Sequence, residues 1–359
     1  MGMKGLYGIV AILIFGFLIA IHEFGHFITA KLSGIRVNEY SINMGPKLWQ
    51  KKIGETMYSL RLIPIGGYCA MEGEDGDSED PRAFTSAAWW KRLIVLCAGS
   101  FMNYLTGFVV MVLLFSFAFQ MPNQPVIASF MEGSAMPEQG LEVGDQLYSI
   151  NGKRIYFASD FTLLIGRVPQ EQCDLTILRD GKRIELEDFR LERRELTDQE
   201  GHTAMYLGLS VGAPTPDTPG NVLRSAWYQC LDFSRLVWYG LQDLFTGRAG
   251  LQDVGGAVSV VDVMVQAGAS EDTVSHGIQQ VLYFGAFIAV NLAVMNMLPI
   301  PALDGGRVLF LLIGTVFTAV TKKKIDPKYE GYINAAAMIL LLGLMLLLFV
   351  KDIYTIWKR

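Results

Sequence analysis

The sequence predicts a polytopic α-helical membrane protein with about four transmembrane helices, a cytoplasmic membrane-associated β-hairpin and an inserted β-rich domain. Apolar residues make up 51% of the 359 residues and charged residues 18%, a composition more apolar than that of soluble proteins. Long uncharged runs, such as residues 5–21, alternate with polar segments. Residues 120–220 instead contain short β-prone segments separated by turn signals. The net charge of −5 does not suggest nucleic-acid binding.

The N-terminal membrane half covers residues 1–120 and contains two predicted spans. The first runs from residue 5 to about residue 31, since about 20 apolar residues cross the hydrocarbon core. Only Lys4 precedes the apolar run and no cleavage site follows it, so we expect an uncleaved helix rather than a signal peptide. The second span covers residues 93–119. Its small or polar stripe predicts close packing against another helix and comprises Gly99, Ser100, Asn103 and Gly107.

The loop between these spans, residues 32–92, carries basic residues that favour a cytoplasmic location. Within it, residues 56–68 are β-prone and contain a Gly66-Gly67 turn signal, so we expect a re-entrant hairpin at about residues 56–70. Two roles are open for this hairpin. It is either a surface feature or a strand edge that dips toward a site in the membrane and pairs with an extended substrate.

The end of the first apolar run carries the motif His22-Glu23-Phe24-Gly25-His26, which reads H-E-x-x-H. Residues four apart share one face of a helix, so His22 and His26 can bind one metal ion, with Glu23 close to the water that the metal activates. The alternative is a pair of helix histidines with ordinary hydrogen-bond partners. A charge and two imidazoles are costly in lipid, which favours a functional metal site.

The inserted β-rich domain is predicted over residues 121–212. The Asn151-Gly152 and Asp180-Gly181 pairs are hairpin signals, and each is flanked by β-prone residues. The expected elements are strands over residues 125–130, 146–150, 174–178 and 183–186, and a capped helix over residues 159–168.

Part of this domain, from Glu132-Gly-Ser-Ala through Gly140-Leu-Glu-Val-Gly-Asp to Asn151-Gly152, resembles the bacterial circularly permuted PDZ domain. The resemblance implies a groove between a strand and a helix that binds peptide termini. A rigid spacer or size filter without a ligand is the alternative.

Residues 213–277 are expected to form a proline-rich linker and an amphipathic aromatic helix at the membrane interface. The C-terminal membrane half, residues 278–359, begins with an apolar tract over residues 278–318. Prolines interrupt this tract, so it forms either one kinked span or two short helices. A last span is predicted over residues 333–350. The basic segment Lys322-Lys-Lys324 favours a cytoplasmic loop and places the β-rich domain outside the cytoplasm.

The interruption contains Asp304, an intramembrane carboxylate that is either a helix cap or a third metal ligand. Two imidazoles and a carboxylate suit Zn²⁺, with water in the fourth position. Glu23 would then act as the general base. Asn291 and Asn296 in the same tract either hydrogen-bond the substrate backbone or hold the broken helix together. The four cysteines show no C-x-x-C spacing, so they predict neither a zinc knuckle nor a redox motif.

Taken in order, the H-E-F-G-H motif, the PDZ-like insert and the segment Asn296-Met-Leu-Pro-Ile-Pro-Ala-Leu-Asp-Gly-Gly306 resemble the site-2 protease family of intramembrane zinc metalloproteases. The likeness is greatest to its bacterial regulator-of-sigma (RseP/RasP-like) branch with a single PDZ domain. By motif, His22, His26 and Asp304 match the family's zinc ligands and Glu23 its catalytic glutamate. The Gly66-Gly67 hairpin is similar to the family's re-entrant loop, which is thought to pair with substrate. The second span matches its G-x-x-x-N pattern at Gly99 and Asn103, with Ser100 where proline is common.

The resemblance implies peptide-bond hydrolysis within a bacterial cell membrane. The implied substrates are single-span membrane proteins already cut by another protease, such as anti-sigma factors, and signal-peptide remnants. Two other functions compete with this one. An ion-coupled transporter would also use broken helices and an intramembrane aspartate, and a non-enzymatic scaffold would use only the PDZ-like domain.

Overall fold

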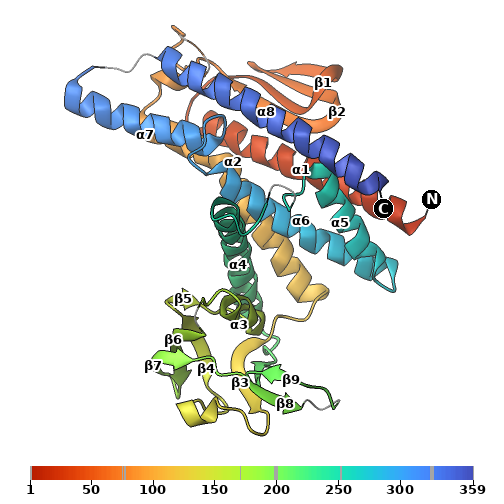
Figure 1. Cartoon of the computed structure of the whole chain (residues 1–359). Coiled ribbons are helices and arrows are strands. Elements are labelled where there is room, and N and C mark those ends of the chain that lie inside the picture. Colours follow the sequence, from red (N-terminus) through yellow and green to blue (C-terminus); the bar gives the residue numbers. More distant parts are fainter. Residues whose placement is uncertain are drawn as a thin grey trace. The chain divides into compact units, whose positions relative to one another are not determined.

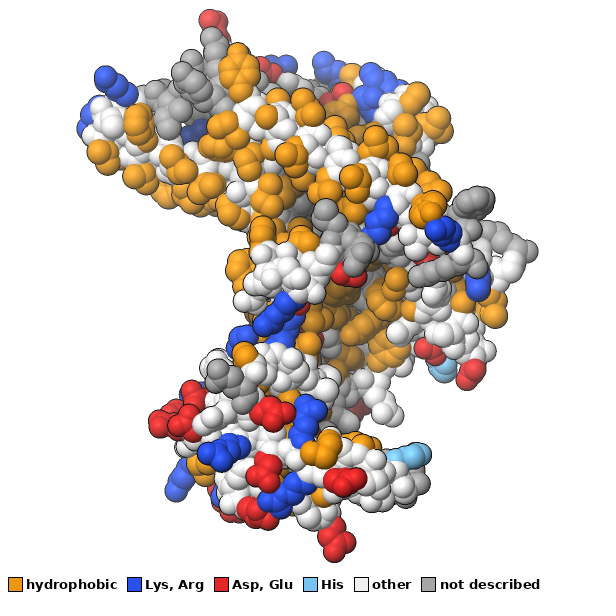
Figure 2. All heavy atoms as spheres, in the orientation of Figure 1, with side chains coloured by type: hydrophobic (Ala, Val, Ile, Leu, Met, Phe, Trp, Pro, Cys, Tyr) orange, Lys and Arg blue, Asp and Glu red, His pale blue; other side chains and the backbone are white. Residues whose placement is uncertain are grey.

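The computed structural model describes residues 2–74, 76, 78–169, 171–197, 201–250, 253–323 and 327–358 (Figure 1). The chain forms two compact units. The first comprises Met1–Leu114 and Phe233–Arg359, and the second comprises Phe115–Asp232. On the face drawn in Figure 2, hydrophobic side chains cover the helices of the first unit, whereas acidic and basic side chains gather on the second.

Five helices among the described residues are long and apolar enough to cross a membrane. They are α1 (Met3–Leu32), α2 (Trp89–Phe117), α6 (Val274–Asn296), α7 (Asp304–Thr321) and α8 (Pro327–Trp357), the last with its candidate span over Gly331–Thr355. This number exceeds the four expected because the tract over residues 278–318 consists of two helices rather than one kinked span. Its prolines lie between α6 and α7, where they end one helix before the next begins. Lys324 of the basic segment lies outside the described residues.

The loop between α1 and α2 forms a sheet from β1 (Val37–Ile53) and β2 (Thr56–Met71), in which residues 49–53 and 56–60 make an antiparallel hairpin. Ile53 pairs with Thr56, so the turn is at Gly54-Glu55, and Gly54 has a φ of +62°. The chain also reverses direction within β2, because residues 57–60 run parallel to residues 39–42 whereas residues 67–71 run antiparallel to residues 37–42. Gly66 lies at this reversal with a φ of +86°, so the turn signal predicted at Gly66-Gly67 is confirmed.

The sheet packs against the helices of the first unit through a buried apolar cluster (Phe27, Ala30, Ile35, Val37, Cys69, Met71, Phe84, Val95 and Leu96). Phe84 begins the short 3₁₀ helix η1 (Phe84–Ser86) that precedes α2. This cluster holds β2 against α1 just beyond His26, so the strand runs past the end of the H-E-x-x-H motif.

A second buried apolar cluster joins α1 to α6 and to α5 (Ala257–Ala269). Its members are Tyr7, Ala11, Leu18, Met264, Val281, Ile288 and Ala289. The N-terminal end of α5 is capped from α8, because the buried Asp352 carboxylate accepts hydrogen bonds from the Gly256 and Ser259 amides at 3.3 and 2.9 Å. Helix α4 (Pro219–Phe245) carries the aromatic residues of the predicted interfacial helix.

The second unit contains a sheet with strand order β10-β3-β4-β6-β7, in which β5 also pairs with β4. Both predicted hairpin signals are confirmed: Asn151-Gly152 joins β4 to β5 and Asp180-Gly181 joins β6 to β7. The elements are β3 (Gln124–Phe130), η2 (Pro137–Gln139), β4 (Gln146–Ile150), β5 (Lys153–Arg154), α3 (Ala158–Ile165), β6 (Gln172–Arg179), β7 (Lys182–Arg190) and β10 (Leu209–Ala213), with a separate pair of β8 (Arg194–Thr197) and β9 (Thr203–Tyr206).

The side chain of Asp145, only 1% exposed, fixes the loop before β4 to β6. Its carboxylate accepts two hydrogen bonds from Arg179, both at 2.7 Å, and one from the Glu142 amide at 2.8 Å. Burial works to raise the pKa of Asp145, but these hydrogen bonds outweigh it, so the pKa lies below the ordinary value for Asp. The ionised carboxylate therefore stabilises the domain.

Candidate metal centre

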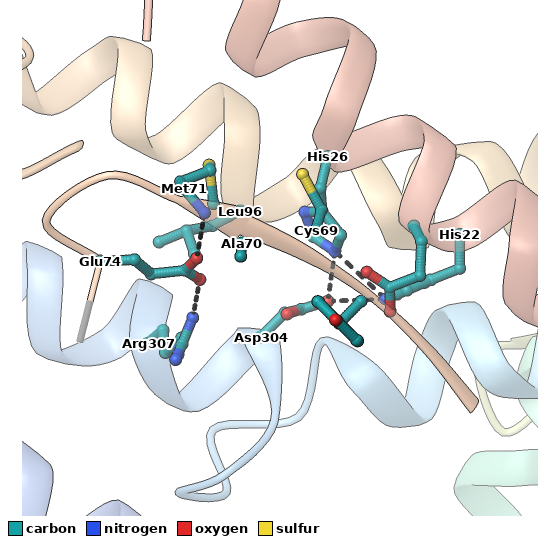
Figure 3. A pocket seen from close by; sticks show the side chains of 11 residues that line it. His22, His26, Cys69, Ala70, Met71, Glu74, Leu96, Asp304 and Arg307 are labelled. Atoms are coloured by element: carbon teal, nitrogen blue, oxygen red, sulfur yellow. Dashed lines mark hydrogen bonds and ion pairs between the residues drawn. The ribbon is translucent and has the colours of Figure 1, made fainter. Parts of the chain in front are cut away.

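Three potential metal ligands from the two ends of the chain converge in the first unit. His22 and His26 lie one turn apart on α1, and Asp304 is the first residue of α7 (Figure 3). The two Nε2 atoms are 3.2 Å apart, and Asp304 Oδ2 lies 3.2 Å from that of His22 and 3.4 Å from that of His26. Among the described residues, this is the one group of three His, Cys, Asp or Glu side chains placed to hold a metal ion.

These separations fit zinc. Four ligands arranged tetrahedrally at zinc's usual bond lengths lie about 3.3 Å from one another. In addition, Asp304 Oδ2 is buried and accepts no hydrogen bond in the structure. If both Nε2 atoms carry lone pairs, as metal ligands must, these lone pairs and that of Asp304 Oδ2 repel, and a shared cation removes that repulsion.

The orientation of His26 also suits a ligand. Its Nδ1 lies 2.8 Å from the backbone carbonyl oxygen of Val95 on α2, which can only accept, so Nδ1 donates. In a neutral imidazole the lone pair is then on Nε2, the atom that faces Asp304. A hydrogen bond of this kind is typical of metal-binding histidines.

Two glycines let α1 and α2 approach at the site. A Cβ atom on Gly25 would lie 2.5 Å from the Ala98 carbonyl oxygen. On Gly99 it would lie 2.4 Å from His26 Nε2 and 2.6 Å from His22 Cε1. Real Cβ atoms do not come this close to other atoms, so Gly99 is needed for the imidazoles to occupy their positions.

Glu23 lines the same cavity as the three ligands, at the side formed by β2. The Cys69 backbone amide donates a hydrogen bond to its carboxylate. A Cβ atom on Gly67 would lie 3.2 Å from Glu23 Cγ, so the strand backbone passes directly beside this side chain. The cavity measures about 380 Å³ and is lined by His22, Glu23, His26, Tyr68, Cys69, Ala70, Met71, Glu74, Leu96, Asp304 and Arg307.

An ion pair lines the cavity on the side away from His22 (Figure 3). Arg307, one turn after Asp304, pairs with Glu74 in the loop after β2 (Figure 3). Glu74 in turn accepts a hydrogen bond from the Met71 amide at 3.3 Å. Sequence reasoning missed both residues, although an arginine within an apolar tract was a signal for Arg307.

The structure thus brings together His22, Glu23, His26 and Asp304, with Gly67 next to Glu23. Gly66 does not line the cavity, and a Cβ atom there would meet Met44 Sδ at 2.7 Å. The half-buried side chains of Asn291 and Asn296 lie on α6, and neither residue lines the cavity.

Comparison with known proteins identifies the family. The profile described as Peptidase family M50 matches residues 10–344. The chain belongs to peptidase family M50. It is 35% identical to a candidate zinc metalloprotease of Clostridium perfringens over 350 residues, which cover 97% of this chain and 98% of the relative. It is also 26% identical to the regulator of sigma-W protease RasP of Bacillus subtilis, over 95% of this chain and 97% of RasP.

Family M50 comprises the site-2 proteases, so the chain is a zinc-dependent intramembrane metalloprotease. Its apolar helices make it a multi-pass membrane protein. The transporter and scaffold functions weighed from the sequence are therefore set aside.

Proposed function

We propose that this protease cleaves the transmembrane segments of single-span membrane proteins at a zinc site formed by His22, His26 and Asp304, with Glu23 as the general acid and base. The observation that carries the proposal is the convergence of three ligand atoms from α1 and α7 beside the Glu23 carboxylate. Zinc supplies Lewis-acid chemistry, because it polarises a carbonyl oxygen and makes water more acidic. Glu23 takes a proton from the attacking water and returns it to the leaving amine.

The edge of β2 is the proposed substrate platform. A transmembrane helix bonds all its amides internally, so it must unwind before a peptide bond can be cut. Four consecutive residues of β2, from Tyr68 to Met71, line the cavity, and among the described residues β1 pairs with one edge of this segment. An unwound substrate that adds to the other edge gains backbone hydrogen bonds beside Glu23. Asn291 and Asn296 are candidates for contacting the substrate further along.

The proposed substrates are anti-sigma factors and signal-peptide remnants already trimmed by another protease. This class is supported by the name of RasP, a regulator of sigma-W. The protein acts in a bacterial cell membrane, with residues 121–212 forming an extracytoplasmic PDZ-like domain. That domain either binds the new peptide terminus or rejects substrates whose external part is still bulky.

The deciding experiment uses a single-span reporter substrate with purified wild type, Glu23→Gln and the control Glu271→Gln. Glu271 lies between α5 and α6, away from the cavity. We expect about one zinc ion per chain in all three, with cleavage by wild type and the control only. Cleavage by Glu23→Gln would refute the role of Glu23, and absence of zinc from the wild type would refute the ligand set.

A second experiment tests the external domain. The reporter is prepared with a short external tail and with a folded external domain, and each form is offered to the wild type and to a variant lacking residues 125–210. A size filter predicts that the deletion variant cleaves both forms while the wild type cleaves only the short one. If the deletion variant rejects the bulky form as well, the domain is not the filter.

A further inference from the structure

Three residues of α2, spaced four apart, face the histidines of α1. They are Val95, Gly99 and Asn103, and residues at this spacing lie on one side of a helix. Val95 accepts the hydrogen bond from His26 Nδ1 through its carbonyl, and Gly99 leaves room for both rings. Asn103 occupies the third position, next to His22.

Asn103 is a buried amide with one close polar neighbour. The residue is 1% exposed, and its Nδ2 atom lies 3.4 Å from His22 Nδ1. Its other terminal atom, Oδ1, is buried and has no hydrogen-bond partner. A buried amide without full hydrogen bonding is costly in an apolar setting, so its position beside a metal-ligand histidine requires a physical reason.

The chemistry of His22 supplies that reason. Its Nε2 atom faces His26 and Asp304, so Nε2 must carry the lone pair if His22 binds a metal. In the neutral ring the proton is then on Nδ1, which needs an acceptor. An amide nitrogen cannot accept, but a half-turn of the Asn103 amide exchanges Nδ2 with Oδ1 and places the oxygen beside Nδ1.

We propose that Asn103 is a positioning residue whose amide oxygen accepts a hydrogen bond from His22 Nδ1 and so keeps His22 Nε2 free to bind the metal. The proposal rests on the proposed role of His22 as a ligand. Helix α2 then orients both histidines of α1, one through the Val95 backbone carbonyl and the other through the Asn103 side chain. This arrangement gives each imidazole the tautomer and ring orientation that a zinc ligand requires.

The test measures the zinc affinity of the purified full-length protein by competition with a chelator. Asn103→Leu keeps a similar shape but removes the acceptor, whereas Asn103→Asp has only acceptor oxygens. Loss of such a partner costs about 10- to 100-fold in metal affinity. We therefore expect zinc binding to weaken by about that factor in Asn103→Leu and to stay within about threefold of the wild type in Asn103→Asp.

Two further variants act as controls. Ser100→Ala removes another buried polar atom from α2 that has no hydrogen-bond partner, and it should leave zinc affinity unchanged. His22→Ala tests the ligand itself: if zinc binds that variant as tightly as the wild type, the proposed metal site is wrong. If His22→Ala abolishes zinc binding while Asn103→Leu retains wild-type affinity, only the positioning role of Asn103 is overturned.

The comparison of the two Asn103 variants also separates orientation from general damage. A merely structural role would be disturbed by a buried aspartate at least as much as by leucine, so rescue by Asn103→Asp supports the proposal. Weakening by about tenfold or more in Asn103→Asp overturns it. If Asn103→Leu does not fold, as judged by thermal unfolding of the metal-free protein, the zinc affinity of Asn103→Asp tests the proposal by itself. Affinity within about threefold of the wild type supports the proposal, and weakening by about tenfold or more overturns it.

Discussion

Adding one methyl group at Gly99 should disable the metal centre while leaving α2 helical. In Gly99→Ala the new Cβ atom would lie 2.4 Å from His26 Nε2 and 2.8 Å from His22 Nε2. Ordinary contact requires about 3.5 Å, so the rings or the helix must move by about 1 Å. A functional site tolerates displacements of its side chains of about 0.5 Å, and a displacement of about 1 Å costs about 100-fold in rate. We expect a loss of cleavage of at least about that size, together with weaker zinc binding.

The assay compares Gly99→Ala with Gly16→Ala, which makes the same substitution on α1 at a position with no heavy atom within 4 Å. The control should cleave the reporter at the wild-type rate, since alanine also favours the helix by about 1 kcal/mol. Both zinc content and cleavage are measured on each protein. Wild-type zinc affinity in Gly99→Ala, with cleavage within about threefold, would refute the steric reasoning.

Three further outcomes are expected. Gly67→Val places a branched side chain against Glu23, because a Cβ atom at residue 67 would lie 3.2 Å from Glu23 Cγ. The variant should lower kcat by about 10-fold or more while it retains zinc, and loss of zinc would contradict this. Asp145→Asn should destabilise the β-rich domain by about 3 kcal/mol, measured by amide hydrogen exchange in β6. Because the pKa of Asp145 is lowered in the folded protein, its contribution to stability is present above the unfolded pKa of about 3.9 and is lost as the pH falls through the folded pKa. Protection factors in β6 that stay the same between neutral pH and pH 3 would contradict this. A chelator should abolish cleavage reversibly with helical content unchanged, since Asp304 and the histidines lie on preformed helices.

The proposed metal ligands could be predicted from the sequence because local rules fix their positions. The spacing of His22 and His26 places both on one helix face whatever surrounds the helix. Asp304 was identifiable because a carboxylate is costly in an apolar tract, so its presence beside a proline break indicates a function. Their convergence across the length of the chain, however, depends on the packing of α1, α2 and α7.

The hairpin shows how much of a sheet a local signal predicts. Consecutive glycines at Gly66 and Gly67 mark a reversal within β2, but the turn at Gly54-Glu55, which joins β1 to β2, was not predicted. The partner strand β1 is long and largely exposed, with no clear alternation of apolar residues, so no periodic signal marks it in the sequence. Gly67 is small because the strand passes Glu23, and this reason is visible only once α1 and β2 are placed together.

Helix α2 shows most clearly why the rest of the site was not predictable. Its glycines, Gly99 and Gly107, belong to one stripe that predicts helix packing. At Gly107 this prediction holds, because a Cβ atom would meet Val290 Cγ2 at 2.8 Å and the Ala286 carbonyl oxygen at 3.0 Å, both on α6. Two turns earlier, the same residue type faces two imidazoles instead. A small residue in a helix indicates only that another group lies close to the backbone. The identity of that group determines whether the space allows helix packing or accommodates a functional side chain. For Asn103 the neighbour is His22, so a residue expected to pack helices lies where it can orient a metal ligand.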